Sequence, residues 1–454
     1  MSIKNINIET YKQDLIVSKK NKHFYGEIRT NIKLVKKMFS LFPKNIFKNP
    51  DLKWLDPCAG KGIYMIVLYK LLFESLQDTL PKEEERHSHI ITKMIFMIEV
   101  NGSHRSKLHD IFGNDANIII TDYLDTDIKE DINADIIIGN PPFNIINKIK
   151  VPTNNTEKKA LDGKSIWQSF INHSLSNLSD EGYLNMITPA IWMKEDHSMY
   201  NIITKNKILN LIALDSNKTT RLFNGEAQTP TCYFLLQKTP SDNIINITDI
   251  TNNMIIQYPV QKSLPLSSSR IFRYMKPLIA RWGSIKVLKT SWRPPRKGYV
   301  FGEKKTKELP YTNIHTVVLK NKNEPCFIKK YTNKPGPYFG KPKLILAHKM
   351  YGFSYYDKSG EFGISNRDNY IILNKTHSEF IKLNSFLNTK FARHLMDATR
   401  YRMKYLEKYY FDLIPNIAAI PDFPEVINNI NVMKYFQTTP EERFKIESRK
   451  DYIL

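Results

Sequence analysis

A tetrad in the first third of the chain, Asn140-Pro141-Pro142-Phe143, combines a side-chain amide, two prolines and an aromatic ring. The side-chain oxygen of Asn140 and the backbone carbonyl of Pro141 are both hydrogen-bond acceptors. Two acceptors that hold one planar amino group favour a pyramidal nitrogen with an available lone pair. The ring of Phe143 can stack on a flat partner. By itself the tetrad indicates only that a strand ends in an unusual loop, which offers two acceptors and an aromatic ring.

The elements that must position this tetrad are strands. Residues 134–139 form an Ile-rich run that stops at the prolines, which is typical of a strand covered on both faces. Three similar runs come earlier, at 54–56, 94–99 and 116–121, and each ends in a polar residue. The pattern predicts an α/β fold with a Rossmann-like, doubly wound, mostly parallel sheet. Ligands bind such sheets at the carboxyl ends of the strands.

A glycine turn follows the first of these strands, in residues 56–62. Small residues there let the backbone approach a ligand. Met65 stands in place of the third glycine of a dinucleotide fingerprint, and Lys61 is followed by Gly62 rather than Ser or Thr, so a phosphate loop is also excluded. Asp56, just before the turn, suits a cofactor that carries an amino group.

Acidic residues end the next two strands. Glu99 can accept both hydroxyls of a ribose, although it lies further from the glycine turn than the usual roughly 20 residues, which implies an insertion. Asp122 suits an adenine edge or, equally, a turn cap. Upstream, Thr30 and Asn31 precede a helical pattern at 32–39. An exposed helix start can hold a carboxylate, and an ordinary packed helix is the alternative.

In this order the motifs resemble those of S-adenosylmethionine-dependent DNA methyltransferases that act on adenine N6, in the gamma arrangement. In that family the cofactor motifs come first, the Asn/Asp-Pro-Pro-aromatic motif follows, and a target-recognition domain comes last. Residues 26–30 resemble the upstream methionine-binding segment. Residues 179–189 resemble a later turn-strand motif, and 222–234 occupy the place of the final hairpin. The resemblance covers residues 1–240.

The resemblance implies a class I methyltransferase fold and the cofactor S-adenosyl-L-methionine. The implied cofactor-binding residues are Thr30, Asp56, Gly60, Gly62, Glu99 and Asp122. The implied catalytic residues are Asn140, Pro141, Pro142 and Phe143. The target adenine would be flipped out of the duplex and stacked on the aromatic ring. A second stacking wall from Tyr233 or Phe234 is possible, with strand core as the alternative. Polar residues 144–164 predict a loop over the site.

Charge points to a polyanionic partner. The net charge is +22, from 67 Lys and Arg against 45 Asp and Glu, although a compositional drift toward Lys would also raise it. Residues 291–350 contain fourteen Lys and Arg against three Asp and Glu, interleaved with aromatic rings. We therefore expect a catalytic domain at 1–240 and a basic, mixed α+β recognition domain at 241–454 that binds double-stranded DNA.

Smaller signals complete the organisation of the chain. The junction is expected at 239–269, which is rich in Ser, Thr, Asn and Pro, and residues 76–88 are expected to be a helix end followed by a loop. In the second domain, 341–348 and 369–373 are expected strands, and 380–409 is expected to be helical.

The three cysteines are widely spaced and predict neither a disulfide framework nor a metal site. No apolar run reaches the length of a signal peptide or a membrane span. We expect a soluble intracellular protein, without a membrane partner, that acts as a monomer on DNA within a restriction-modification system.

Alternatives remain open at this point. The same tetrad chemistry serves enzymes that methylate RNA bases or the amide nitrogen of a protein glutamine. A restriction enzyme fused to a methyltransferase is not expected, because no nuclease core fits ahead of the glycine turn and Glu303-Lys304-Lys305 is a weak signal. A catalytically silent nucleic-acid-binding protein is disfavoured by the intact tetrad.

Overall fold

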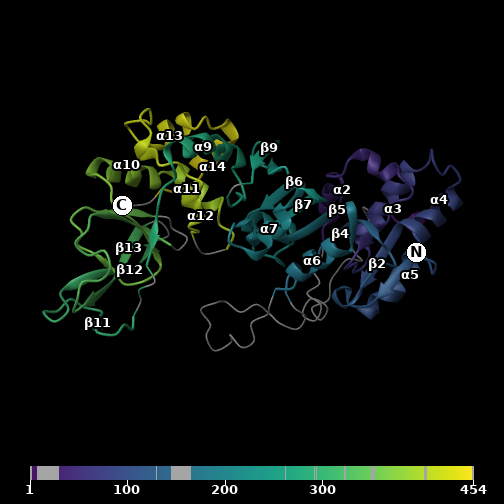
Figure 1. Cartoon of the computed structure of the whole chain (residues 1–454), viewed down its shortest axis with the longest axis horizontal. Helices are drawn as coiled ribbons and strands as arrows, with labels where there is room; N and C mark the ends of the chain where they lie inside the picture. Colours follow the sequence, from purple (N-terminus) through teal and green to yellow (C-terminus); the bar gives the residue numbers. More distant parts are fainter. Residues whose placement is uncertain are drawn as a thin grey trace. The chain divides into compact units, whose positions relative to one another are not determined.

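The computed structural model describes residues 3–7, 30–128, 130–144, 165–260, 262–290, 292, 294–321, 324–348, 353–402 and 406–451. The chain divides into two compact units. The first comprises Met1–Trp192, Asp196–Thr248 and Gln257–Val260. The second comprises Met193–Glu195, Asp249–Ile256 and Gln261–Leu454. Figure 1 shows the chain coloured from its N-terminus to its C-terminus.

Most of a nine-stranded sheet, in the order β3-β2-β1-β4-β5-β7-β6-β8-β9, lies in the first unit. Strands β1 to β5 are parallel, and β7 runs antiparallel to both of its neighbours, β5 and β6. The predicted doubly wound, mostly parallel sheet is therefore confirmed. The strands are β1 Trp54–Asp56, β2 Ile95–Glu99, β3 Asn117–Ile120, β4 Ala134–Gly139, β5 Leu178–Pro189, β6 Asn206–Leu214, β7 Thr231–Pro240, β8 Ile244–Asp249 and β9 Met254–Pro259.

The strand order reverses between β1 and β4. The chain proceeds from β1 outward to β2 and β3, then returns to place β4 on the other side of β1. Crossovers that leave in opposite directions open a crevice at the carboxyl ends of the two central strands. The glycine turn follows β1 and the tetrad follows β4, so the topology brings these two motifs to the same crevice.

Helices cover this sheet. They are α2 Ile32–Phe39, α3 Ile63–Ser75, α4 Glu83–His89, α5 Arg105–Phe112, α6 Trp167–Asn177, α7 Ser198–Thr204 and α8 Ser216–Leu222. Short single turns lie at η1 Ile3–Asn5, η3 Lys44–Lys48, η4 Ile90–Met94, η5 Gly102–His104, η6 Tyr123–Asp125 and η8 Ala190–Met193. Asn31 caps α2 by accepting a hydrogen bond from the backbone N–H of Lys33 at 2.9 Å. The apolar side of α2 packs with α3 in one core cluster against the sheet.

One prediction about a connection was wrong. Residues 83–89 form α4 rather than a loop, because three glutamates in its first turn and basic residues in its last turn complement the helix dipole. The expected domain junction at 239–269 contains β8 and β9, which extend the sheet, and the chain passes between the two units within it, after Thr248, Ile256 and Val260. In β8, Ile245 and Ile247 are buried on alternate positions, and this period-two pattern was hidden by the many polar residues around it.

The second unit is mixed α and β, as predicted. Its two four-stranded sheets have the orders β10-β17-β14-β15 and β11-β13-β12-β16. The strands are β10 Leu288–Lys289, β11 Phe301–Gly302, β12 Tyr311–Lys320, β13 Glu324–Thr332, β14 Lys343–Ala347, β15 Ser354–Asp357, β16 Gly363–Ile364 and β17 Asn369–Ile372. The two strands expected in this region correspond to β14 and β17, which pair antiparallel.

The helices of this unit gather on one side of it, as Figure 1 shows. They are α9 Ser269–Trp282, α10 His377–Leu387, α11 Lys390–Asp397, α12 Tyr409–Asp412, α13 Asn429–Tyr435 and α14 Pro440–Glu447, with one further turn at η9 Ile417–Ala419. The expected helix at 380–409 is broken between α10 and α11. The side chain of Thr389 caps the start of α11, which favours a new helix over continuation.

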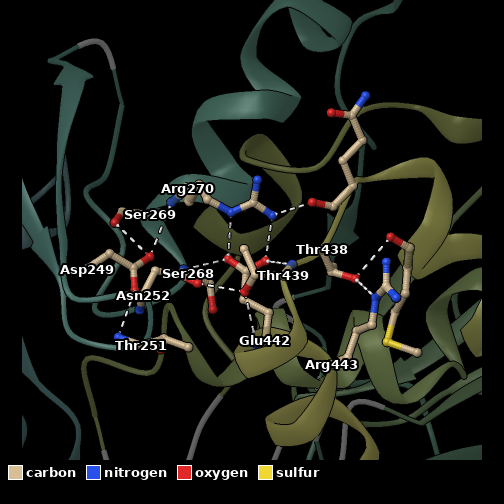
Figure 2. Close-up of polar contacts among 12 residues, drawn as sticks. Asp249, Thr251, Asn252, Ser268, Ser269, Arg270, Thr438, Thr439, Glu442 and Arg443 are labelled. Carbon is tan, nitrogen blue, oxygen red and sulfur yellow. Dashed lines mark hydrogen bonds and ion pairs between the residues drawn. The ribbon is translucent and has the colours of Figure 1, made fainter.

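An ion pair between a half-buried arginine and a buried glutamate joins α9 and α14 of the second unit (Figure 2). The guanidinium of Arg270 in α9 donates to both carboxylate oxygens of Glu442 in α14, at 3.0 and 2.6 Å. Glu442 also accepts from the backbone N–H of Thr439 at 2.9 Å, in a capping box. Such a bidentate pair holds two helices in one relative orientation. Among the described residues, no helix is long and apolar enough to cross a membrane.

Candidate active site

The glycine turn and the tetrad are in contact through Gly139. Strands β1 and β4 pair directly, with Trp54 opposite Ile136. A Cβ added to Gly139 would lie 3.0 Å from Asp56 Oδ1 and 3.2 Å from Cys58 Sγ. Any larger residue would push the tetrad away from the turn, so glycine at this position allows the close approach.

Asp56 is fully buried at the end of β1. Its Oδ1 accepts a hydrogen bond from the backbone N–H of Cys58 at 3.1 Å, but its Oδ2 has no partner among the described residues. Burial, and secondarily the charge of Glu99, raise the pKa of Asp56 to about 7, against the opposing effect of the Cys58 N–H. An unpartnered buried carboxylate oxygen is costly. The arrangement is suited to a ligand that donates a proton or carries positive charge.

The glycine turn contains two residues in the left-handed region, Gly60 at φ +54° and Gly62 at φ +80°. A Cβ on Gly62 would meet the ring of Phe112 at 2.8 Å, whereas one on Gly60 would meet nothing within 4 Å. Gly62 therefore serves helix packing at the start of α3. Gly60 leaves open space beside the backbone, where a ligand can approach.

Glu99 ties the end of β2 to the glycine turn. Its Oε2 accepts from the backbone N–H of Gly60 at 2.6 Å, and its Oε1 accepts from the N–H of Asn101 at 2.8 Å. The ring of His104 lies 3.7 Å from Oε1, and burial lowers the pKa of this histidine. A carboxylate can accept several hydrogen bonds at once, so a role of Glu99 toward ligand hydroxyls stays a prediction.

Asp122 follows β3 at the same edge of the sheet. Its Oδ1 accepts from the backbone N–H of Leu124 at 3.0 Å and caps the turn η6. Glu99 pairs with Ile120, two residues before Asp122, so both carboxylates lie at neighbouring strand ends. The capping alternative is thus realised, and a further role toward a ligand stays a prediction.

Asn140 is linked to a residue far upstream. Its Nδ2 donates to the Thr30 hydroxyl at 3.1 Å, across 110 positions of sequence. Its backbone N–H donates to the thiol sulfur of Cys58 in the glycine turn. Thr30, predicted as a cofactor residue, therefore contacts the tetrad itself. The amide N–H bond to Thr30 leaves Oδ1 at the opposite end of the side-chain amide, available to a donor.

Phe143 is half-buried and packs against the edge of the main core cluster. Its carbonyl accepts from the backbone N–H of Ile166 at 3.1 Å. Tyr233 and Phe234 belong to the interior, at 6% and 0% exposure, so the strand-core alternative is correct for both and the second stacking wall is not formed by them. Of the expected loop at 144–164, residues 145–164 lie outside the described residues.

Several contacts around the site had no signal in the sequence. Asn101 and His104 contact the predicted residue Glu99 but carry no recognisable motif. Cys58 lies inside the predicted glycine turn, but its own contacts were not predicted. Tyr64 was visible only as one apolar position of a helix. Its phenol group contacts Thr30 and Met38 inside the core.

Residues 3–219 match the family model described as Eco57I restriction-modification methylase. This part of the chain is therefore similar to methylase domains of that family. The match begins before α2 and ends within α8, and it includes every residue of the predicted cofactor and catalytic sets.

A relative from Mycoplasma pneumoniae, named an uncharacterized adenine-specific methylase, supports the same assignment. It is 23% identical over 291 residues, which cover 46% of this chain and 67% of the relative. Together with the family match, it confirms the resemblance to adenine methyltransferases that the motifs indicated.

Solved structures show more distant similarity to this chain. The M protein of the EcoKI type I restriction enzyme has a TM-score of 0.37 and 18% identity, over 48% of this chain and 47% of that protein. A class I S-adenosylmethionine-dependent methyltransferase from Listeria monocytogenes, described as putative, has a TM-score of 0.35 and 15% identity, over 55% of this chain and 75% of its own. This chain thus spans about half the length of the EcoKI protein.

Proposed function

We propose that this protein is an S-adenosylmethionine-dependent DNA methyltransferase that modifies N6 of adenine within a restriction-modification system. One observation carries the proposal: the amide of Asn140, held at its nitrogen by Thr30, lies beside the glycine turn at the switch point of the sheet. An acceptor beside a cofactor turn is what transfer to an amino nitrogen requires.

The residues at the strand ends fit the cofactor. The unpartnered Oδ2 of Asp56 suits the amino group in the methionine part of the cofactor. The open space at Gly60 leaves room for cofactor atoms that lie against the protein backbone. The Glu99 carboxylate at the end of β2 suits ribose hydroxyls, and Asp122 suits the edge of the cofactor adenine. When bound, S-adenosyl-L-methionine supplies a sulfonium methyl group whose transfer to an amino nitrogen leaves a neutral thioether and releases one proton.

The tetrad acts on the acceptor. Asn140 Oδ1 and the Pro141 carbonyl accept hydrogen bonds from the two N–H groups of the adenine amino group, which keeps the nitrogen lone pair available for attack. Pro142 stiffens the loop, since proline restricts its own φ and the residue before it. Phe143 provides a ring on which the flipped base stacks, worth about 1–3 kcal/mol. An adenine paired inside a duplex cannot reach these groups, so base flipping is part of the proposal.

The second unit supports double-stranded DNA as the substrate. Lys304, Lys305 and Lys307 are exposed in the loop after β11, and the half-buried rings of Tyr299 and Phe301 lie nearby in the same sheet region. Exposed lysines beside aromatic rings suit phosphate contacts and stacking. We propose that residues 241–454 recognise the target sequence and that the protein works as a monomer on DNA inside the cell.

The test is transfer of a tritiated methyl group from the cofactor to duplex DNA, RNA or protein, followed by digestion to nucleosides or amino acids. Label in N6-methyladenine from DNA is the expected result. Label only in RNA, or only in methylglutamine, would show that the substrate is RNA or protein rather than DNA. No transfer to any of the three, with the cofactor still bound, would favour a silent binding protein.

A further inference from the structure

The side-chain amide of Asn140 has two ends of nearly equal size and opposite function. Its oxygen accepts hydrogen bonds, and its nitrogen only donates. The oxygen can accept a hydrogen bond from the amino group of a base. If the amide were flipped, its NH₂ group would face that amino group, and two donors cannot form a hydrogen bond. Catalysis at this position therefore needs a device that selects one of two orientations of the amide.

A line of three polar groups runs from this amide into the core. Asn140 Nδ2 donates to Thr30 Oγ1 at 3.1 Å. The Thr30 hydroxyl is a hydrogen-bond partner of the Tyr64 phenol. The phenol in turn donates to the thioether sulfur of Met38 at 3.4 Å. Thr30, Tyr64 and Met38 are 5%, 3% and 0% exposed, so bulk water does not compete for these groups.

The inner end of this line sets its direction. A thioether carries no proton, so the phenol of Tyr64 must be the donor to Met38. Burial raises the pKa of Tyr64 well above its usual range, so the phenol keeps its proton. Because the phenol proton is engaged with Met38, the phenol oxygen can only accept a hydrogen bond from the Thr30 hydroxyl. The Thr30 oxygen then accepts from Asn140, and only the amide nitrogen can donate to it.

The groups in this line belong to rigid elements. Met38 lies near the end of α2, and its carbonyl accepts from Asn185 Nδ2 in β5 at 2.9 Å. Tyr64 lies in the first turn of α3, two residues after Gly62, so the helix that begins at the cofactor turn also carries the phenol. The line therefore connects α2, α3 and the residue that follows β4.

We propose that Thr30 and Tyr64 are positioning residues that hold the Asn140 amide with its oxygen toward the substrate. This inference depends on the proposed function, because it assigns these side chains to methyl transfer. It also gives Thr30 a task beyond the cofactor role expected from its place in the sequence.

The first test is Tyr64→Phe, which removes one oxygen and leaves the ring. One net hydrogen bond is worth about a factor of 2–12, so we expect kcat to fall about fivefold. KM for DNA and cofactor affinity by calorimetry should stay within twofold. Tyr69→Phe is the matched control, because it removes a phenol from the same helix whose hydroxyl bonds to His87 at 2.8 Å, outside the site. Its kcat should not change.

Two substitutions of Thr30 distinguish a role of its hydroxyl from a role in packing. Thr30→Ser keeps the hydroxyl and should retain most of kcat, while Thr30→Val keeps the volume and should lose about tenfold or less, since two bonds of the line are broken. Equal losses in both variants would show a packing role and overturn the inference.

The sharpest test uses Asn140→Asp, since Asp also occurs at this position in the resembled family. A carboxylate has two equivalent oxygens, so it has no wrong orientation. When Tyr64→Phe is added to Asn140→Asp, its penalty should vanish, as a double-mutant cycle would show. A penalty of unchanged size would refute the orienting role. If Asn140→Asp transfers no methyl group, the Thr30→Ser and Thr30→Val pair decides.

A second readout does not need activity. In protein labelled with ¹⁵N-asparagine, the side-chain NH₂ signal that disappears in Asn140→Asp identifies Asn140. Tyr64→Phe should speed proton exchange of that signal severalfold, and unchanged exchange would contradict the inference. If the parent protein transfers no methyl group, the proposed function fails while this measurement still reports on the bond to Thr30. If the parent is active and Tyr64→Phe matches it, only the inference fails.

Discussion

Two buried aspartates, one in each unit, have opposite surroundings. Asp357 in β15 is 1% exposed, and its carboxylate accepts from Lys343 Nζ at 2.6 Å and from the backbone N–H groups of Glu361 and Phe362 at 2.9 and 3.0 Å. Asp56 in β1 is 0% exposed, and one of its oxygens accepts nothing from the described residues. The carboxylate of Asp357 is fully partnered, whereas, within the described residues, one oxygen of Asp56 is not.

This difference distinguishes a buried carboxylate that stabilises the fold from one that is suited to binding a ligand. A buried charge with a full set of partners holds elements together, as Lys343 and Asp357 do between β14 and β15. A buried carboxylate oxygen without a partner destabilises the fold by itself and is compensated only when a ligand binds. Removing partners should therefore harm stability in the second unit and ligand binding or turnover in the first.

The largest effect is expected from Asn140→Ala. Loss of the acceptor should lower kcat by about 10³-fold, the upper range for deleting one preorganised polar group. Cofactor affinity and thermal stability should stay near those of the parent, because the side chain makes a single bond to Thr30. Turnover and calorimetry on the same sample check this, and retained turnover would refute the acceptor role.

Lys343→Met should mainly affect stability. It leaves Asp357 buried without its cation, which costs about 3–4 kcal/mol in unfolding free energy. Denaturant unfolding measures the loss, and cofactor binding to the first unit should persist. The double variant Lys343→Met with Asp357→Asn removes both charges, keeps a side-chain oxygen as acceptor for the backbone N–H groups, and should recover most of the stability. If Lys343→Met alone were as stable as the parent, the ion pair would not stabilise the second unit, and the proposed contrast with Asp56 would be wrong.

Asp56→Asn should have the reverse profile. Loss of the charge that faces the cofactor should weaken its binding about 30-fold, the size of one charged hydrogen bond. Stability should be unchanged or higher, because an unpartnered buried charge is removed. Calorimetry with S-adenosyl-L-methionine and thermal unfolding test both parts. Asp135→Asn is a suitable control, since this carboxylate is partnered by Lys53 N–H and Ser179 away from the turn.

The smallest effect concerns pH. The pKa of Asp56 is raised to about 7, so the carboxyl is mostly protonated at pH 6 and mostly ionised at pH 8. If the ionised form binds the cofactor amino group, affinity should rise about tenfold from pH 6 to pH 8, as expected for one titrating group. Asp56→Asn should remove the dependence. A pH-independent affinity in the parent would show that this carboxylate does not pair with a charged ligand group.

Much of the first unit was predictable because its signals are local. An apolar run that stops at two prolines must end a strand near Asn140, and glycines after Asp56 must form a turn. The alternating burial of β8 and the short helix α4 were missed, since polar neighbours masked both patterns. In the second unit, the helix break at Thr389 depends on one capping hydroxyl, which a periodic pattern does not show.

The sequence by itself determined the residue types of the site and their order along the chain, and through them the fold class and the family resemblance. Only the tertiary structure decided that Thr30 holds the Asn140 amide, that Tyr64 lies behind it, and that Asp56 keeps an unpartnered oxygen. The physical reason is that a hydrogen bond depends on distance and direction in space. Strand register and helix packing set these across 110 positions, where local spacing carries no information about them.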